Sequence, residues 1–318
     1  CNQTKITQFL LLGFHGPQVL RSSLFYICLV IYIMALGANL LIIALYLGSH
    51  HLRSPMYFFL SNLSVTDISL STNVVPNLLS ALLTNGKPMS VSACIIQYFI
   101  SGFITGAECL LLTVMAYDRY LAICKPLHYV TIMTNKHCLH LVIGSWVEIL
   151  LLSVLATIMT TNSGFCGCNT LDYIFCDFLP LLEVSCSDAF IIEKGVAVLT
   201  IPVLVLPLLF IVTTYVCIFL SILRISSNTG RQKAFSTCSS HLTVVSTCYG
   251  ILLAKYAVPS KGQSVNVNKI ISLLYIMVAP LFNPIIYSFR NQNIWKALNI
   301  SGFKGIYEDQ VEEQKVYN

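Results

Sequence analysis

Seven long apolar runs constrain this chain more than any other feature of its sequence. They lie near residues 24–47, 56–80, 95–121, 141–160, 196–223, 236–258 and 270–288. A helix needs about 20 apolar residues to cross the roughly 30 Å hydrocarbon core of a bilayer. Only helices and closed barrels satisfy their backbone groups in lipid, and barrel strands alternate apolar with polar residues. The continuous runs therefore predict an all-α membrane protein, a bundle of seven transmembrane helices.

The charges fit this prediction and indicate an orientation. Only 10% of the residues are charged and 56% are apolar, whereas about a quarter of the residues in a soluble protein are charged. Lysine and arginine accumulate in short cytoplasmic loops. Here they follow the first, third, fifth and seventh runs, at Arg53, Lys125, Lys136, Arg224, Arg231, Lys233, Arg290 and Lys296. The N-terminus is thus predicted outside and the C-terminus inside, although Lys255, Lys261 and Lys269 weaken the bias. The net charge of +5 follows from this topology, and no continuous basic face suggests nucleic-acid binding.

Cysteines and a glycosylation sequence agree with this orientation. Disulfides persist on the oxidising side of a membrane, and five cysteines are predicted there: Cys94, Cys166, Cys168, Cys176 and Cys186. Asn2-Gln3-Thr4 is an acceptor for N-glycosylation on the same side. The sequence therefore predicts outer disulfides and a glycan on Asn2.

Three acidic residues lie inside the apolar runs, at Asp67, Glu108 and Glu148. An ionisable group in the bilayer costs about 2.5–3.5 kcal/mol on insertion scales, so it normally faces the bundle interior and serves a function. At about 100° per residue, Glu108 shares one helix face with Ser101, Thr105 and Arg119. The alternative is a polar seam against neighbouring helices. For Glu148 two positions stay open: it either faces the bundle interior or snorkels at the outer boundary.

Small residues and prolines add to this pattern. Gly102 and Gly106 flank the polar face, where they either permit close helix packing or leave room for a ligand. Five prolines lie inside the runs, at Pro76, Pro202, Pro207, Pro280 and Pro284. Each frees a backbone carbonyl and can kink its helix. Several tolerated kinks favour a bundle with an internal cavity.

Four motifs in order carry a family resemblance. They are Pro55–Ser64 (PMYFFLSNLS), Met115–Tyr129 (MAYDRYLAICKPLHY), Lys233–Leu242 (KAFSTCSSHL) and Pro280–Asn291 (PLFNPIIYSFRN). The chain resembles vertebrate odorant receptors of the tetrapod-type class, which are rhodopsin-like G-protein-coupled receptors. The resemblance extends from Leu11 to Arg290, nearly the whole chain. It implies one receptor domain over residues 1–301, a short amphipathic cytoplasmic helix near 290–300 and a cytoplasmic tail at 302–318.

The resemblance also implies functional residues. The G-protein switch would comprise Asp118, Arg119, Tyr120, Tyr215, Asn283, Pro284 and Tyr287. Asp67 and Glu108 match an inner acidic pair that can hold an allosteric sodium ion; two carboxylates in a dry bundle otherwise share a proton or shift their pKa values. A protonated, hydrogen-bonded pair is the alternative. No other cofactor is expected.

Two disulfides and a ligand site are implied in the same way. Cys94 would pair with Cys176 and Cys166 with Cys186, leaving Cys168 either free or competing with Cys166. The ligand-binding residues would be Ser101, Gly102, Thr105, Gly106, Thr200, Val203, Tyr249, Leu252, Leu253 and Tyr256. Such an apolar pocket with a few hydroxyls suits a neutral molecule of modest size. Lys255 either reaches the pocket mouth and favours an acidic or carbonyl-bearing ligand, or snorkels to the outer interface.

The expected function is that of an odorant receptor, not an enzyme. Its partners would be a small organic odorant, a stimulatory G protein of the olfactory type that raises cyclic AMP, membrane lipid and trafficking accessory proteins. Its expected place is the plasma membrane of olfactory neuron cilia. One alternative is a rhodopsin-like receptor for a non-odorant metabolite. A transporter is more distant because it would require paired half-helices related by internal symmetry, and the sequence shows no such symmetry.

Overall fold

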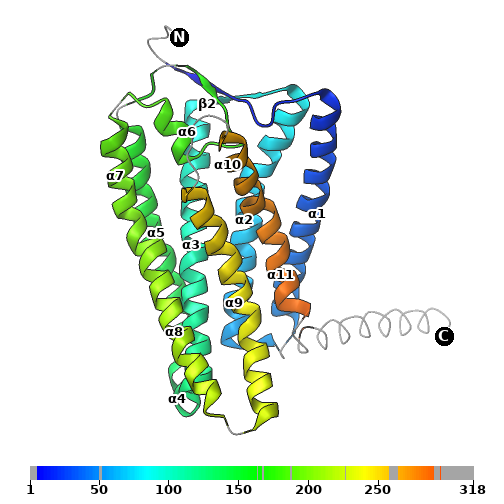
Figure 1. Cartoon of the computed structure of the whole chain (residues 1–318), viewed down its shortest axis with the longest axis vertical. Coiled ribbons are helices and arrows are strands. Elements are labelled where there is room, and N and C mark those ends of the chain that lie inside the picture. The colour runs from blue at the N-terminus through cyan, green and yellow to red at the C-terminus, as the bar shows by residue number, and fades with distance from the viewer. Residues whose placement is uncertain are drawn as a thin grey trace, which may run out of the picture.

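The computed structural model describes residues 6–49, 52–162, 164–166, 168–186, 188–225, 227–257, 264–289 and 294. In this part of the chain, seven long helical segments run roughly along one axis (Figure 1). Five are continuous: α1 (Gln18–Gly48), α2 (Pro55–Thr84), α3 (Val91–Cys124), α5 (Asn135–Thr161) and α9 (Asn228–Ala257). The predicted fold class is confirmed, because a helical segment covers each of the seven apolar runs.

The other two segments change from α-helix to π-helix and back. One comprises α7 (Ala189–Thr200), η2 (Ile201–Val205) and α8 (Leu206–Leu223). The other comprises α10 (Ser264–Leu273), η3 (Leu274–Val278) and α11 (Ala279–Phe289). Pro202 lies within η2, and Pro280 is the second residue of α11, which directly follows η3. A π-turn accommodates the local loss of an N–H donor, and such turns concentrate at functional sites.

Side chains from two other helices compensate for the prolines of the last segment. Pro280 and Pro284 have no N–H to give to the carbonyl groups four residues earlier, at Ile276 and Pro280. Ser71 of α2 donates its hydroxyl to the Ile276 carbonyl at 3.0 Å, and the Asn39 amide of α1 donates to the Pro280 carbonyl at 2.8 Å. Polar residues buried in α1 and α2 therefore hold the seventh segment in its irregular shape.

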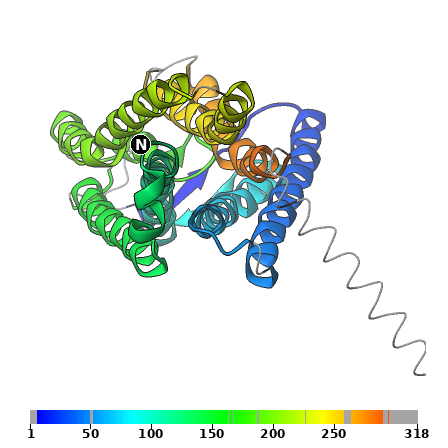
Figure 2. The same ribbon diagram turned by 90° about the horizontal axis from the view of Figure 1, so that it is seen from below.

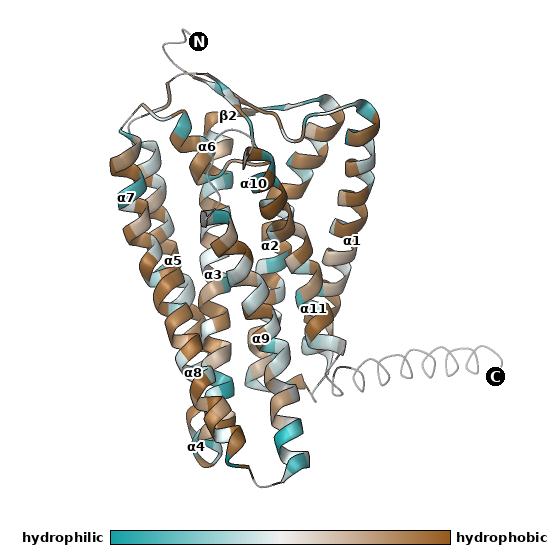
Figure 3. Cartoon of the chain, viewed as in Figure 1, coloured by the Kyte–Doolittle hydropathy of each residue, from teal (hydrophilic) through white to brown (hydrophobic). Residues whose placement is uncertain are grey.

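The outward faces of the helices are apolar. Ile33 of α1, Leu151 of α5 and Val212 of α8 are 58%, 65% and 53% exposed. By length and composition, five of the described helical segments are apolar enough to cross a membrane; α2 and α9 carry more polar residues. Hydrophobic residues dominate the middle of the bundle, and hydrophilic residues gather toward its ends (Figure 3). The bundle is built to face lipid along its sides.

Helix α3 organises the interior. It contacts α2, α5, α8 and α9, and two thirds of the residues in its most apolar stretch are buried inside the bundle. Seen end on, α1 and α5 lie on opposite sides of the bundle (Figure 2). Side chains of α3 therefore reach the centre of the bundle along its whole length.

A small sheet covers the end of the bundle that the sequence predicts to be outer, and the apolar runs alone did not predict this sheet. Strand β1 (Gln8–Leu11) pairs antiparallel with β2 (Lys87–Ser90), in the register Gln8 to Ser90, and parallel with β3 (Thr170–Leu171). A short helix, α6 (Phe178–Glu183), follows β3 in the same outer loop. Cys94 and Cys176 form a disulfide in the apolar core beneath this sheet, and Cys166 is bonded to Cys186. Cys168 is disulfide-bonded too, so it is not free.

The opposite end of the bundle, predicted to be cytoplasmic, carries one more short helix, α4 (Pro126–Ile132), between α3 and α5. The Thr134 side chain accepts a hydrogen bond from the His137 N–H and so caps α5. Asn2, the tail at 302–318 and the predicted amphipathic helix near 290–300, apart from Ile294, lie outside the described residues.

Candidate functional site

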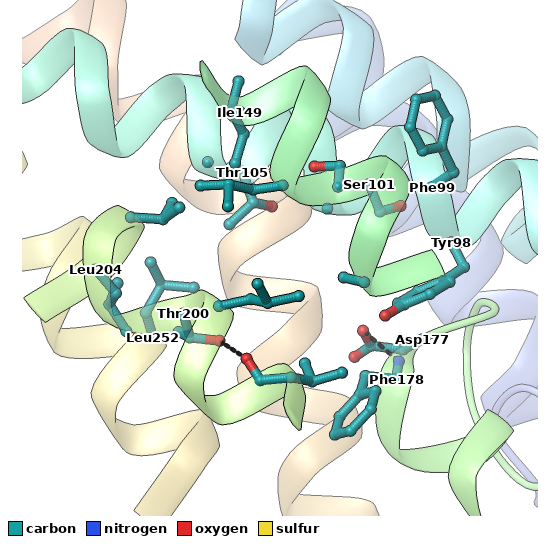
Figure 4. A pocket seen from close by; sticks show the side chains of 18 of the residues that line it. Tyr98, Phe99, Ser101, Thr105, Ile149, Asp177, Phe178, Thr200, Leu204 and Leu252 are labelled. Carbon is teal, nitrogen blue, oxygen red and sulfur yellow. Dashed lines mark hydrogen bonds between the residues drawn. The ribbon is translucent and has the colours of Figure 1, made fainter. Parts of the chain in front are cut away.

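A cavity of about 400 Å³ opens inside the outer half of the bundle. Its wall combines residues of α3, α5, α7, η2, α9 and η3 with the outer loop that carries α6 (Figure 4). The volume falls in the range of pockets that bind small organic molecules, about 300–1,000 Å³. Tyr98, Ser101, Thr105 and Thr200 place hydroxyl groups in a wall that is otherwise mainly apolar.

Seven of the ten residues predicted for the ligand site line this cavity: Ser101, Gly102, Thr105, Gly106, Thr200, Val203 and Leu252. Leu253 does not, because the next helical position turns its side chain away from the bundle, where it is 50% exposed. Tyr249 is buried but does not line the cavity, because it lies about one turn deeper than Leu252. The side chain of Tyr256 lies outside the described residues.

The two glycines of α3 have different surroundings. A Cβ atom built on Gly106 would lie 2.1 Å from Cδ1 of Ile149 and 3.1 Å from Cγ1 of Val203. Nothing lies within 4 Å of a Cβ atom built on Gly102. Gly106 therefore permits the close approach of α5 to α3, whereas Gly102 leaves open space in the cavity wall.

Charged residues at the mouth of the cavity were largely missed. Lys255 does line the cavity, so the alternative in which it snorkels to the interface is wrong. Its ammonium group forms an ion pair with Asp177 of the outer loop, and the two side chains are only 16% and 14% exposed. Glu193 lines the same region. Asp177 and Glu193 belong to the acidic stretch after the fourth apolar run, Asp177 in the loop and Glu193 in α7. Nothing in the sequence indicated that they would face the pocket.

The two central acids lie below the cavity and are almost completely buried, Asp67 at 1% and Glu108 at 2% exposure. Asn283 donates to both carboxylate oxygens of Asp67 at 3.1 Å. The hydroxyl of Tyr275, which lines the cavity, donates to Glu108 Oε2 at 2.6 Å. Among the described residues, no basic side chain forms an ion pair with either acid. Glu148, in contrast, is exposed on the outer face of α5 and does not face the bundle.

The predicted switch residues surround the inner end of α3. Arg119 donates through Nε to Asp118 Oδ2 at 3.0 Å, and its Nη2 contacts the same oxygen. The Tyr129 hydroxyl of α4 donates to the other oxygen, Oδ1, at 2.8 Å. Burial, then the charge of Asp118, raises the pKa of the Tyr129 hydroxyl above its ordinary value, so it stays a donor at neutral pH. Asp118 is therefore held from both sides, by Arg119 and by Tyr129.

The remaining predicted residues lie on α3, α8 and α11. Tyr120 packs partly buried against Ile218, Ile222 and Cys238. Tyr287 is 1% exposed, and its hydroxyl has no hydrogen-bond partner in the described part of the chain. Tyr215 bonds to His241 of α9 at 2.6 Å. His241 was missed as a site residue, although a histidine within an apolar run was a signal that marked it.

A seven-helix bundle with an internal outer cavity and a buried arginine–aspartate pair at its inner end defines a membrane receptor of the rhodopsin-like type. The family model described as "Olfactory receptor" matches residues 27–301. The chain is 42% identical to Olfactory receptor 5G3 of Homo sapiens over 92% of this chain and 93% of that protein. It is 44% identical to Olfactory receptor 5P60 of Mus musculus, over 93% of this chain and 92% of that protein. The chain therefore belongs to the olfactory receptor family.

Proposed function

We propose that this receptor binds a small uncharged organic odorant in the outer cavity and activates a stimulatory, olfactory-type G protein, so that cyclic AMP rises. The observation that carries the proposal is the double role of Tyr275. It lines the cavity and donates to Glu108. A ligand that displaces this tyrosine therefore disturbs the buried polar core directly.

From that core, the change reaches the inner end through α9. Leu252 of α9 lines the cavity, and His241 of the same helix is bonded to Tyr215 and to the Leu112 carbonyl group. A ligand that favours an outward position of α9 shifts the population of receptors toward that state. The cleft that opens beside Arg119 then receives the G protein. Bound ligand and bound G protein stabilise the same state, so each raises affinity for the other.

Asp67 and Glu108 are the residues that would hold an allosteric sodium ion. They fit the ion because both carboxylates are buried and no positive charge balances them among the described residues. Their hydrogen-bond donors, Asn283 and Tyr275, are neutral. Hard cations prefer such oxygen ligands. The ion would supply that charge and stabilise the resting state. We expect sodium to raise the unfolding temperature of the receptor and potassium, as the control, not to do so. The effect of sodium should disappear in Asp67→Asn.

The orientation, with the N-terminus and the glycan of Asn2 outside, belongs to the same proposal. It is supported by the disulfides at the sheet-covered end. The plasma membrane of olfactory cilia is the proposed location, and accessory proteins would assist transport to it.

The test measures cyclic AMP in cells that express the receptor with an olfactory-type G protein. The cells are exposed to a panel of aldehydes, ketones, alcohols, acids and amines. We expect a dose-dependent rise that Arg119→Ala abolishes at unchanged surface expression. Arg21→Ala is the matched control, because Arg21 bonds to the Leu82 carbonyl on α2 rather than to Asp118, and it retains the response. Full signalling by Arg119→Ala would overturn the assigned role, and responses confined to non-volatile metabolites would favour the alternative receptor class.

A further inference from the structure

The ion pair in the cavity wall joins two elements that are distant in sequence. Lys255 lies in the last turn of α9, and Asp177 lies between the disulfide-bonded Cys176 and helix α6. The Lys255 ammonium group is also 5.4 Å from the centre of the Phe175 ring. Both charged side chains are mostly buried, so water screens them little and the attraction between them is strong.

Asp177 is held in place independently of Lys255. Its Oδ1 accepts the Phe178 N–H at 2.9 Å and so caps α6. The adjacent Cys176 is bonded to Cys94, and its own N–H donates to Gln97 at 2.9 Å. A carboxylate fixed in this way is a preorganised counter-ion. A ligand carboxylate that approached Lys255 would have to compete with it.

We propose that the Lys255–Asp177 pair determines ligand charge: each buried charge is already matched by the other, so the receptor accepts uncharged ligands and rejects carboxylates and ammonium ions. The inference rests on the proposed function and specifies its ligand class. An incoming carboxylate meets Asp177, and an incoming ammonium ion meets Lys255. Glu193 of the same wall is exposed, so water screens its charge for either ligand. An aldehyde or ketone meets neither penalty, and the hydroxyls of the wall supply its polar contacts (Figure 4).

Removing one member of the pair leaves the other charge in the wall without this counter-ion. Such a charge is costly until an opposite charge reaches it. Asp177→Asn therefore creates a site for a carboxylate at Lys255, and Lys255→Met creates a site for an ammonium ion at Asp177. Asparagine caps a helix as well as aspartate does, so Asp177→Asn leaves α6 in place.

The experiment measures thermal unfolding of the purified full-length receptor with three matched probes: heptanal, heptanoate and heptylamine. A ligand that binds the folded state raises the unfolding temperature whether or not a G protein couples, so failed signalling and failed selectivity are distinguishable. We expect Asp177→Asn to gain stabilisation by heptanoate at a concentration at least tenfold lower than the wild type needs, about 1.4 kcal/mol. Lys255→Met gains stabilisation by heptylamine on the same scale.

Two controls complete the design. The double variant Asp177→Asn/Lys255→Met lacks both charges of the pair, so neither a lysine nor an aspartate is left to attract a probe, and we expect no gain for heptanoate or heptylamine. It tests the pair even where one single variant folds poorly. Glu193→Gln removes an exposed carboxylate of the same wall. Unlike Asp177→Asn, it is not expected to increase the stabilisation of the receptor by heptanoate. Unchanged probe preference in both single variants, or equal gains in the double variant, would overturn the proposal.

Discussion

Tyr215 and His241 connect α8 to α9 through a hydrogen bond of 2.6 Å between the tyrosine hydroxyl and Nδ1, with the two rings stacked 5.7 Å apart. The other ring nitrogen, Nε2, lies 3.1 Å from the carbonyl oxygen of Leu112 in α3. A neutral imidazole has one donor and one acceptor nitrogen. The tautomer protonated on Nε2 donates to Leu112 and accepts from Tyr215, so one buried side chain joins three helices.

His241→Phe is expected to raise basal signalling. The ring is kept, but both hydrogen bonds are lost, at about 1 kcal/mol each. In the proposed activation α9 separates from α3, so the loss favours the active state by a several-fold change in population. Basal cyclic AMP, normalised to surface expression, measures the effect. Leu242→Phe changes the neighbouring, 43% exposed position and leaves basal signalling unchanged; equal activity of the two variants would contradict the role of His241.

The sequence predicted the helices well because each is specified by its own apolar run. It also predicted the ion pair of Asp118 with Arg119, since the two residues are neighbours in the chain and their pairing needs no tertiary information; their role as a switch stays a prediction. The hydrogen-bond partners of the other polar residues could not be predicted from the sequence. Tyr275 is 167 positions from Glu108, and only the packing of the seventh segment against α3 brings them together.

The ligand cavity was predicted in part for a similar physical reason. Leu252 and Leu253 are equally apolar, and only the rotation of α9 decides that the first faces the cavity and the second does not. Lys255 was recognised as unusual, but its counter-ion lies in an irregular loop that no periodic pattern describes. Loops are positioned by disulfides and by contacts with the scaffold, and neither is encoded locally.

Tyr129→Phe tests the second contact on Asp118. The substitution removes the 2.8 Å hydrogen bond to Oδ1 and should raise basal cyclic AMP, because about 1 kcal/mol of stabilisation of the resting pair is lost. The raised pKa of the Tyr129 hydroxyl keeps it protonated at neutral and mildly alkaline pH. The difference from the wild type is therefore the same at intracellular pH values of about 6.5 and 8, because free tyrosine titrates only near 10. A difference that disappears at the higher value would show that the hydroxyl ionises.

Gly106→Ala and Gly102→Ala are expected to separate packing from ligand binding. A methyl group on Gly106 would overlap Ile149, and overpacking of this kind costs about 1–3 kcal/mol. We expect a lower unfolding temperature and reduced surface expression. Gly102→Ala places its methyl group in open cavity space, so stability is kept while ligand potency changes. Equal stability of the two variants would show that α5 is not packed tightly against α3.

The last prediction concerns Lys269 of α10, which is fully buried although its partner is not. Its ammonium group donates to the Gly13 carbonyl at 2.8 Å and to Asp172 Oδ1 at 2.6 Å. The lysine side chain is 0% exposed and the aspartate 53%. The two members of the pair therefore depend on one another unequally, since water can solvate Asp172 but not Lys269.

Asp172→Asn is accordingly expected to destabilise the receptor more than Lys269→Met. Asparagine leaves a buried ammonium group without its counter-ion, at about 1–3 kcal/mol. Methionine fills the space of the lysine stem and leaves a carboxylate that water solvates, so its cost stays below about 1 kcal/mol. Thermal unfolding in detergent measures both, and the double variant should match Lys269→Met alone, because the asparagine no longer faces a charge. The opposite order of the single variants would mean that the contact with Gly13, rather than the ion pair, holds Lys269 in place.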